Sequence, residues 1–162
     1  ETAKYFKENK YNLSFSLLGD EKDNIILNSK VEDYNEKKII DYYGFQDNII
    51  PILEKVHFVV LPTKYNEGVP KSLIEAAASG KPIICSDNSG CKSIVKDQIN
   101  GFIIPEVNLE NLIKTIKLVL NYSYSDLNKM AINSREIATN NFSVNDINKS
   151  YLDKIELINE KK

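Results

Sequence analysis

Short apolar runs, separated by segments of helical spacing, constrain the fold of this chain more than any other feature. The runs are rich in Ile, Val, Phe and Leu and lie at residues 13–18, 38–43, 57–61, 82–86 and 101–105. They show little polar alternation, which is typical of strands that are covered on both faces of a parallel sheet. The intervening segments with helical apolar spacing are residues 1–10, 48–56, 70–79 and 108–120. This alternation predicts an α/β fold with a doubly wound, Rossmann-like parallel sheet.

The carboxyl-terminal part of the chain is helical in pattern. Residues 125–157 have the spacing of two helices that are interrupted near residues 140–143, and we expect the last helix at residues 144–160. Residues 20–37 are polar and only weakly periodic, so the sequence assigns them no element. A length of 162 residues is enough for one domain with its own core. We therefore expect residues 1–162 to form a single domain with a helical tail.

Composition excludes several classes of function. The 21 Lys and Arg residues against 23 Asp and Glu residues give a net charge of −2, which argues against a nucleic-acid partner. No apolar run reaches the ~20 residues that a membrane-spanning helix needs. Two cysteines and one histidine make neither a disulfide framework nor an ordinary zinc site. We therefore expect a reduced, cytoplasmic protein without an ordinary zinc site.

The chemistry is concentrated in residues 58–80, where a predicted strand ends at Pro62 and a helix begins near Pro70. In open α/β sheets, ligands bind at the carboxyl ends of strands, where such loops lie. Gly68 allows the backbone to approach a ligand closely. Together with the helix dipole, free N–H groups at the helix start make a site for a phosphate or a similar anion. The residues expected to offer these N–H groups are Lys71, Ser72 and Leu73.

Two carboxylates flank this predicted anion site, Glu67 in the loop and Glu75 within the helix. A carboxylate repels an anion, but it accepts hydrogen bonds from the paired hydroxyls of a sugar. Phosphate between two sugar-binding carboxylates indicates a nucleotide sugar as the ligand. As an isolated feature, however, a pair of glutamates around a helix start is also what a solvated helix face would show.

A longer set of residues carries a resemblance to a known family. The matching segments are 62–68 (PTKYNEG), 75–82 (EAAASGKP), Ser86, Asp87 and Gly90, 100–104 (NGFII), and 142–143. They resemble the carboxyl-terminal, donor-binding domain of GT-B glycosyltransferases of the retaining family 4 (group 1) type. The signature of that group is two glutamates with seven residues between them, the spacing of Glu67 and Glu75. The resemblance covers about residues 13–157, nearly the whole chain.

The resemblance implies a role for each matching position. Glu67 is the catalytic-site residue that contacts hydroxyls of the transferred sugar, and Glu75 holds the ribose. Lys71 is included as a phosphate contact, the alternative being an ordinary exposed lysine on the first helical turn. The residues implied for the diphosphate are Gly68, Val69, Lys71, Ser72 and Leu73; those implied for the base and the nucleotide floor are Gly44, Phe45 and Gly19.

The family also implies a reaction and partners. The chain would bind a UDP- or GDP-linked sugar, without a metal, for transfer of a hexosyl unit to a glycan or lipid-linked acceptor in surface polysaccharide biosynthesis. Because the chain starts at Glu1 and its only methionine is Met130, we expect a piece of a longer protein. The acceptor-binding amino-terminal domain and the first strand with its basic turn would then be absent. We expect this chain alone to be inactive, and the longer protein to associate with the inner face of a membrane.

Other functions stay open at this stage. A nucleotide-sugar epimerase of the GT-B type would use a similar scaffold, and a non-catalytic nucleotide-binding module would keep the fold without the reaction. A generic dinucleotide-binding domain is disfavoured, because no Gly-x-Gly-x-x-Gly turn follows any of the predicted strands.

Overall fold

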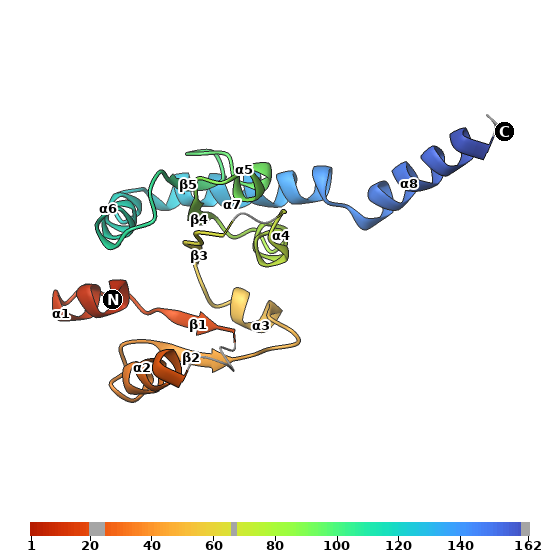
Figure 1. Cartoon of the computed structure of the whole chain (residues 1–162). Helices are drawn as coiled ribbons and strands as arrows, with labels where there is room; N and C mark the ends of the chain where they lie inside the picture. Colours follow the sequence, from red (N-terminus) through yellow and green to blue (C-terminus); the bar gives the residue numbers. More distant parts are fainter. Residues whose placement is uncertain (20–24, 66–67, 160–162) are drawn as a thin grey trace. The chain divides into compact units, whose positions relative to one another are not determined.

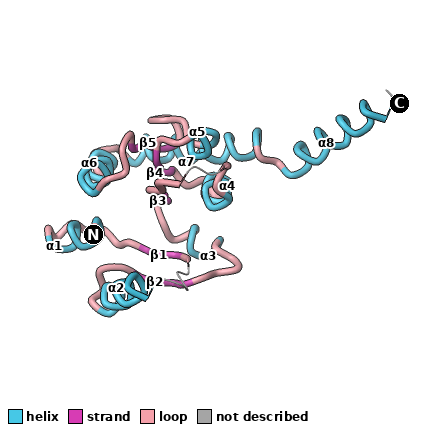
Figure 2. Tube along the Cα trace, in the orientation of Figure 1, coloured by secondary structure: helices cyan, strands magenta, loops and turns pink. Residues whose placement is uncertain are grey.

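The computed structural model describes residues 1–19, 25–65 and 68–159. The chain forms two compact units, Glu1–Ile49 and Ile50–Lys162. Strands alternate with helices along the chain, and each strand pair is parallel (Figures 1 and 2). The predicted parallel α/β class is therefore confirmed.

The first unit is a two-stranded parallel sheet with two helices. Its elements are α1 (Thr2–Glu8), β1 (Ser16–Leu18), α2 (Ile25–Glu36) and β2 (Asp41–Gly44). Phe6 of α1 is fully buried, and its ring lies edge-on to Tyr11 with centroids 5.0 Å apart. Such edge-to-face pairs add to the stabilisation that burial of the rings provides.

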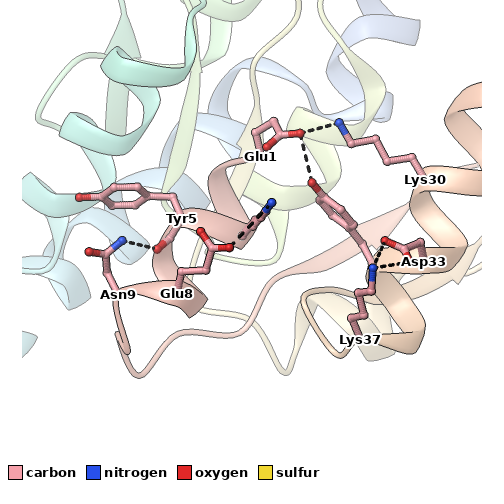
Figure 3. A network of polar contacts seen from close by, with 9 residues as sticks. Glu1, Tyr5, Glu8, Asn9, Lys30, Asp33 and Lys37 are labelled. Atoms are coloured by element: carbon pink, nitrogen blue, oxygen red, sulfur yellow. Dashed lines mark hydrogen bonds and ion pairs between the residues drawn. The ribbon is translucent and has the colours of Figure 1, made fainter.

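Polar contacts join the start of α1 to α2 (Figure 3). Glu1 Oε1 accepts hydrogen bonds from Lys30 Nζ at 2.5 Å and from the Tyr34 hydroxyl at 3.1 Å. The Lys30 and Tyr34 hydrogen bonds lower the pKa of the Glu1 carboxyl to about 2. Because the lowered pKa favours the charged form, this contact persists at neutral pH and is lost only in strong acid.

The second unit contains a three-stranded parallel sheet in the order β3-β4-β5. Its elements are α3 (Ile50–Leu53), β3 (Val59–Leu61), α4 (Lys71–Ala78), β4 (Ile83–Ser86), α5 (Ser89–Ile94), β5 (Gly101–Ile104), α6 (Leu109–Val119), α7 (Tyr124–Asn141) and α8 (Val144–Asn159). The apolar face of α4 packs on β3, β4 and α7. The last helix matches the one expected at residues 144–160, of which residue 160 lies outside the described part.

The prediction that the apolar runs are covered on both faces holds for some strands and fails for others. All four residues of β4 are buried, because β4 lies between two strands and beneath α4. The three residues of β1 are exposed, and Val60 of β3 is exposed as well. Each of these two strands pairs with one neighbour among the described residues. The apolar runs therefore predict these strands correctly, but the expectation that both faces of each strand are buried is wrong.

Two helices were not predicted from the sequence. α2 lies within residues 20–37, and it ends in a turn in which Lys38 has φ of 55° and the N–H of Ile39 donates to Tyr34 O at 2.8 Å. A turn of this kind at the end of a helix usually contains glycine, so the sequence gives no signal for the end of α2. Because the turn occupies residues 37–40, β2 begins at Asp41 and not at residue 38, where the apolar run starts. α5 is short, and its only signal is Asn88, whose side chain accepts the N–H of Cys91 at 2.8 Å.

The Asn100-Gly101 pair, which is part of the resemblance, has a structural role. Asn100 is fully buried: its Oδ1 accepts from Lys96 N at 2.7 Å, and its Nδ2 donates to Ile94 O at 3.1 Å. Ser134 of α7 donates its hydroxyl to Lys81 O at 2.9 Å and lies 3.3 Å from Asn100 Nδ2. These buried polar groups are all hydrogen-bonded. Through Ser134 they connect α7 to the turn before β5 and to the turn before β4.

Gly101 has no room for a side chain. A Cβ at this position would lie 1.9 Å from the backbone oxygen of Ile83 on the neighbouring strand. We expect Gly101→Ala to lower the free energy of unfolding by at least about 3 kcal/mol, because backbone atoms of a central strand must move. Urea denaturation followed by circular dichroism measures the change.

Gly68→Ala is the matched control for this variant. A Cβ at Gly68 meets nothing within 4 Å, and its φ lies outside the left-handed region. We expect its effect on the free energy of unfolding to stay within about 0.5 kcal/mol. Equal stability of the two variants would contradict the close backbone packing of β4 and β5.

Candidate functional site

The loop between β3 and α4 runs from the carboxyl end of a strand to the start of a helix. Pro62 follows β3 directly, and Thr63 Oγ1 accepts the backbone N–H of Tyr65 at 3.1 Å. Glu67, predicted to contact the transferred sugar, lies outside the described residues. The described parts of the loop are residues 62–65 and 68–70, which place its two ends at the sheet and at the helix.

The start of α4 offers two backbone N–H groups, not the three that the sequence predicts. Pro70 occupies the N-cap position in extended conformation, and its carbonyl accepts the N–H groups of Leu73 at 3.0 Å and Ile74 at 3.2 Å. No described residue accepts the N–H groups of Lys71 or Ser72. The prediction of a free Leu73 N–H is therefore wrong, because the first turn tightens around Pro70 and sends the Leu73 side chain, which is fully buried, into the core.

The residues just before α4 leave the helix start open. Gly68 has free space around the position of a Cβ, as a close approach by a ligand requires. Val69 is partly buried and packs against the core, so its side chain is directed away from solvent. Pro70 cannot provide the side-chain oxygen that caps many helices. The positive end of the α4 dipole therefore meets solvent at Lys71 and Ser72.

Lys71 and Glu75 lie one turn apart on α4 and form an ion pair, with Lys71 Nζ 3.4 Å from Glu75 Oε1. The Lys71 side chain is 87% exposed and that of Glu75 is 34% exposed. A surface pair of this kind contributes little to stability, and the order Lys before Glu is the less favourable one. Either side chain can therefore leave the ion pair and contact a ligand instead, at a modest cost in free energy.

The loop after β4 lies beside the β3–α4 loop. Ser86 is the last residue of β4, Asp87 pairs with Lys92 Nζ at 2.5 Å, and Gly90 is buried within α5. Asn88 Nδ2 lies 3.5 Å from Tyr65 O, a long hydrogen bond between the two loops. A hollow of about 300 Å³ lies at this edge of the sheet, lined by residues that follow β3, β4 and β5.

The first unit holds the other predicted positions at the carboxyl ends of β1 and β2. Gly19 and Gly44 have φ of 119° and 62°, and the Gly19 N–H donates to Gly44 O at 2.9 Å. The side chain of Phe45 follows and is 68% exposed. Tyr42, which the sequence did not single out, donates its hydroxyl to Gly19 O at 3.0 Å. The sequence did not indicate this hydrogen bond, because the apolar run that contains Tyr42 predicts only a strand.

The cysteines offer no nucleophile to this edge of the sheet. Cys85 and Cys91 are both free thiols and both buried. Burial raises the pKa of the Cys85 thiol, and the neighbouring Cys91 adds to the rise, so Cys85 stays protonated at neutral pH. Across residues 1–19, 25–65 and 68–159, no group of three or more His, Cys, Asp and Glu side chains is placed to hold a metal ion.

The parallel strands, the strand-to-helix loop and the open start of α4 define a Rossmann-like α/β domain. The family described as "Glycosyl transferases group 1" matches residues 1–137. The chain belongs to this family and is a domain of the GT-B glycosyltransferase type. The two glutamates and the Asn-Gly-Phe segment that carry the sequence resemblance all fall within the matched residues.

Related proteins agree with this assignment. The chain is 31% identical over 147 residues to the UDP-Gal:alpha-D-GlcNAc-diphosphoundecaprenol alpha-1,3-galactosyltransferase of Escherichia coli, covering 89% of this chain and 37% of that protein. Its fold is similar to a glycosyltransferase from Rickettsia africae, with a TM-score of 0.85 at 19% identity over 99% of this chain and 44% of the other. Anabaena HepE in complex with UDP gives a TM-score of 0.78 at 21% identity, over 89% and 41%.

The chain covers only part of each of these relatives. It spans about two fifths of the length of the relatives, from 37% to 44% in the three cases. In the described part of the chain, no helix combines the length and the apolar character needed to cross a membrane.

The first turn of α4 contains a buried residue, Leu73, and an exposed residue, Ser72, and their substitution should affect the free energy of unfolding differently. We expect Leu73→Ala to lower the free energy of unfolding by about 2–5 kcal/mol, because it leaves a cavity under the helix start. Ser72 is exposed, so Ser72→Ala should change the free energy of unfolding by less than about 0.5 kcal/mol. Urea denaturation checks both. A stable Leu73→Ala protein would show that this turn is not anchored in the core.

Proposed function

We propose that this chain is the donor-binding domain of a retaining glycosyltransferase that transfers a hexosyl unit from a nucleotide-diphospho-sugar. The observation that carries the proposal is the open start of α4, where two backbone N–H groups without an acceptor among the described residues lie one turn from Glu75. Membership of the glycosyltransferase family supports this function over that of a module without catalysis.

The diphosphate binds at the start of α4. The N–H groups of Lys71 and Ser72 and the helix dipole supply positive charge, and open space at Gly68 lets the phosphates reach the backbone. Lys71 leaves its ion pair with Glu75 and turns to the phosphates. As the bond to the sugar breaks, the same groups stabilise the charge that develops on the leaving diphosphate. We propose that these residues and a basic turn elsewhere in the enzyme perform this task without a metal.

Glu75 and Glu67 bind the two sugar rings of the donor. Glu75, released by Lys71, accepts hydrogen bonds from the ribose hydroxyls, and Glu67 accepts them from the transferred sugar. The relative from Escherichia coli is named for an alpha linkage made from UDP-Gal. Retention of configuration by this chain's enzyme is in line with that name, and it requires the acceptor hydroxyl to attack from the face that the diphosphate leaves.

For the base, we propose Gly44, Gly19 and Phe45, the positions that the family resemblance implies. Gly44 and Gly19 bring the backbone of two strand ends together without side chains, and the exposed ring of Phe45 offers a surface for a planar base. The relative from Escherichia coli, at 31% identity, is named for UDP-Gal, which supports UDP over GDP for this chain.

The name of a relative supports a proposal for the acceptor. The galactosyltransferase from Escherichia coli is named for a diphosphoundecaprenol-linked sugar. By analogy, we propose a glycan or lipid-linked acceptor, a role in surface polysaccharide biosynthesis, and a cytoplasmic enzyme that works at the inner face of a membrane. The acceptor reaches the donor through a further domain of the longer enzyme.

Nucleotide binding by the 162-residue chain tests the donor site. We expect UDP to bind by isothermal titration calorimetry, and Glu75→Gln to weaken binding roughly 10- to 100-fold, because a charged acceptor of ribose hydroxyls is lost. Glu110→Gln, also a glutamate near the start of a helix, is the matched control and should bind UDP as well as the parent. Absence of heat with UDP and with GDP from a folded chain would refute the donor site.

Catalysis is tested in the longer enzyme that contains this domain, because the isolated chain should transfer no sugar. We expect Glu67→Gln to reduce kcat by at least about 100-fold with little change in folding, because its carboxylate contacts the ring that reacts. Full activity of this variant in the longer enzyme would favour a non-catalytic module. Incubation with the donor alone, followed by product analysis, distinguishes a transferase from an epimerase, which would change the sugar without an acceptor.

A further inference from the structure

The hollow of about 300 Å³ at the carboxyl ends of β3, β4 and β5 has no role in the donor site described above. Its size is at the lower end of the ~300–1,000 Å³ range of ligand pockets, which suits a single sugar ring better than a nucleotide. Three consecutive strands of the second unit contribute to it through the loops that follow them. The polar side chains that line it are Thr63, Lys64, Ser86, Asp87, Asn88 and Glu106.

The lining combines both charges with neutral polar groups, which restricts the chemistry of the ligand. The carboxylate of Glu106 would repel a phosphate, and the ammonium of Lys64 would repel a metal ion. Asp87 already pairs with Lys92 at 2.5 Å, so its charge is largely neutralised. A ligand without charge that both donates and accepts hydrogen bonds fits this mixture, and a polyhydroxylated ring does so at each of its hydroxyls.

An exposed tyrosine, Tyr65, is the next residue in the chain after the lining residue Lys64. The carbonyl of Tyr65 is 3.5 Å from Asn88 Nδ2, so its backbone contacts a lining residue. Its side chain is 81% exposed, although a tyrosine ring is mostly apolar. Polar groups in a hollow, with an exposed aromatic residue on the same loop, are a combination that suits a pyranose, whose hydroxyls lie at the rim and whose C–H groups form an apolar face.

We propose that this hollow is an acceptor subsite that holds a hexopyranose ring of the acceptor glycan. The proposal rests on the proposed transferase function, in which two rings must meet at one place. The loop between β3 and α4 contributes to both sites, with Thr63 and Lys64 at the hollow and Gly68 to Ser72 at the proposed diphosphate site. Selection of the acceptor is then shared between the further domain of the enzyme and the donor-binding domain.

The test is an NMR titration of the 162-residue chain with neutral methyl glycosides. The probes are the methyl α-glycosides of glucose, galactose, N-acetylglucosamine and N-acetylgalactosamine, added in the presence of saturating UDP. We expect at least one of them to shift the backbone amide signals of residues 63–65, 86–88 and 106–107. Tyr65→Ala should weaken this binding about three- to tenfold, because it removes the apolar face. Tyr124→Ala is the matched control, since this tyrosine is 86% exposed at the start of α7, and it should have no effect.

Three results would overturn the subsite. They are the absence of shifts at the hollow with all four glycosides, shifts that Tyr65→Ala leaves unchanged, and displacement of the glycoside by UDP-glucose or UDP-galactose, which would assign the hollow to the donor sugar. UDP shifts at Lys71 and Ser72 report on the donor site independently. Glycoside binding at the hollow without any UDP or GDP binding would therefore support the subsite and refute the donor site.

Discussion

The packing of the small apolar face of α4 determines where the functional loop of this domain ends. Leu73, Ala76 and Ala77 are fully buried in a cluster with residues of β4 and α7. Alanine at two of these positions lets the helices approach closely, and Leu73 fixes the first turn in the core. Because the helix start is fixed, its open N–H groups keep one position relative to the carboxyl end of β3. The polar loop between them can carry chemistry while the elements on both sides stay rigid.

Electrostatics assign different tasks to the two sides of this loop. At α4 the backbone offers positive charge without a capping side chain, which suits an anion. At the ends of β4 and β5 both signs of charge lie close together, which suits a neutral polar ligand. The Lys71–Glu75 pair holds the two groups close together without strong mutual stabilisation. Its opening on ligand binding would cost the domain little.

The sequence predicts the order of strands and helices, the parallel sheet and the family, because apolar runs and a glycine- and proline-punctuated motif reflect local physics. It places the α4 start within one residue, since Pro70 sits at the N-cap position instead of the first helical position. It does not predict that Leu73 gives its N–H to Pro70, because that depends on how tightly the first turn winds. It also misses α2, since Lys38 adopts at its end a conformation that glycine usually signals.

Tertiary context explains the other differences. The exposure of β1 depends on its neighbours in space, which an apolar run of residues does not report. The hollow is formed by residues as distant in the chain as Lys64, which lies in the matching segment 62–68, and Glu106, which lies in none of the matching segments. Tyr42 joins Gly19 through a hydroxyl whose partner is 23 positions away. Such contacts become visible only once the strands are paired.

The contact between Gly101 and the backbone of Ile83 sets the spacing of two strands by main-chain atoms alone. Apolar side chains elsewhere in the core can therefore exchange one for another over evolutionary time while this spacing is preserved. In a chain so rich in Ile, Lys and Asn, the starts of β4 and β5 would keep their geometry even as the core repacks. Variation among relatives should then concentrate in the polar loops, where it changes which sugars are handled and leaves the scaffold intact.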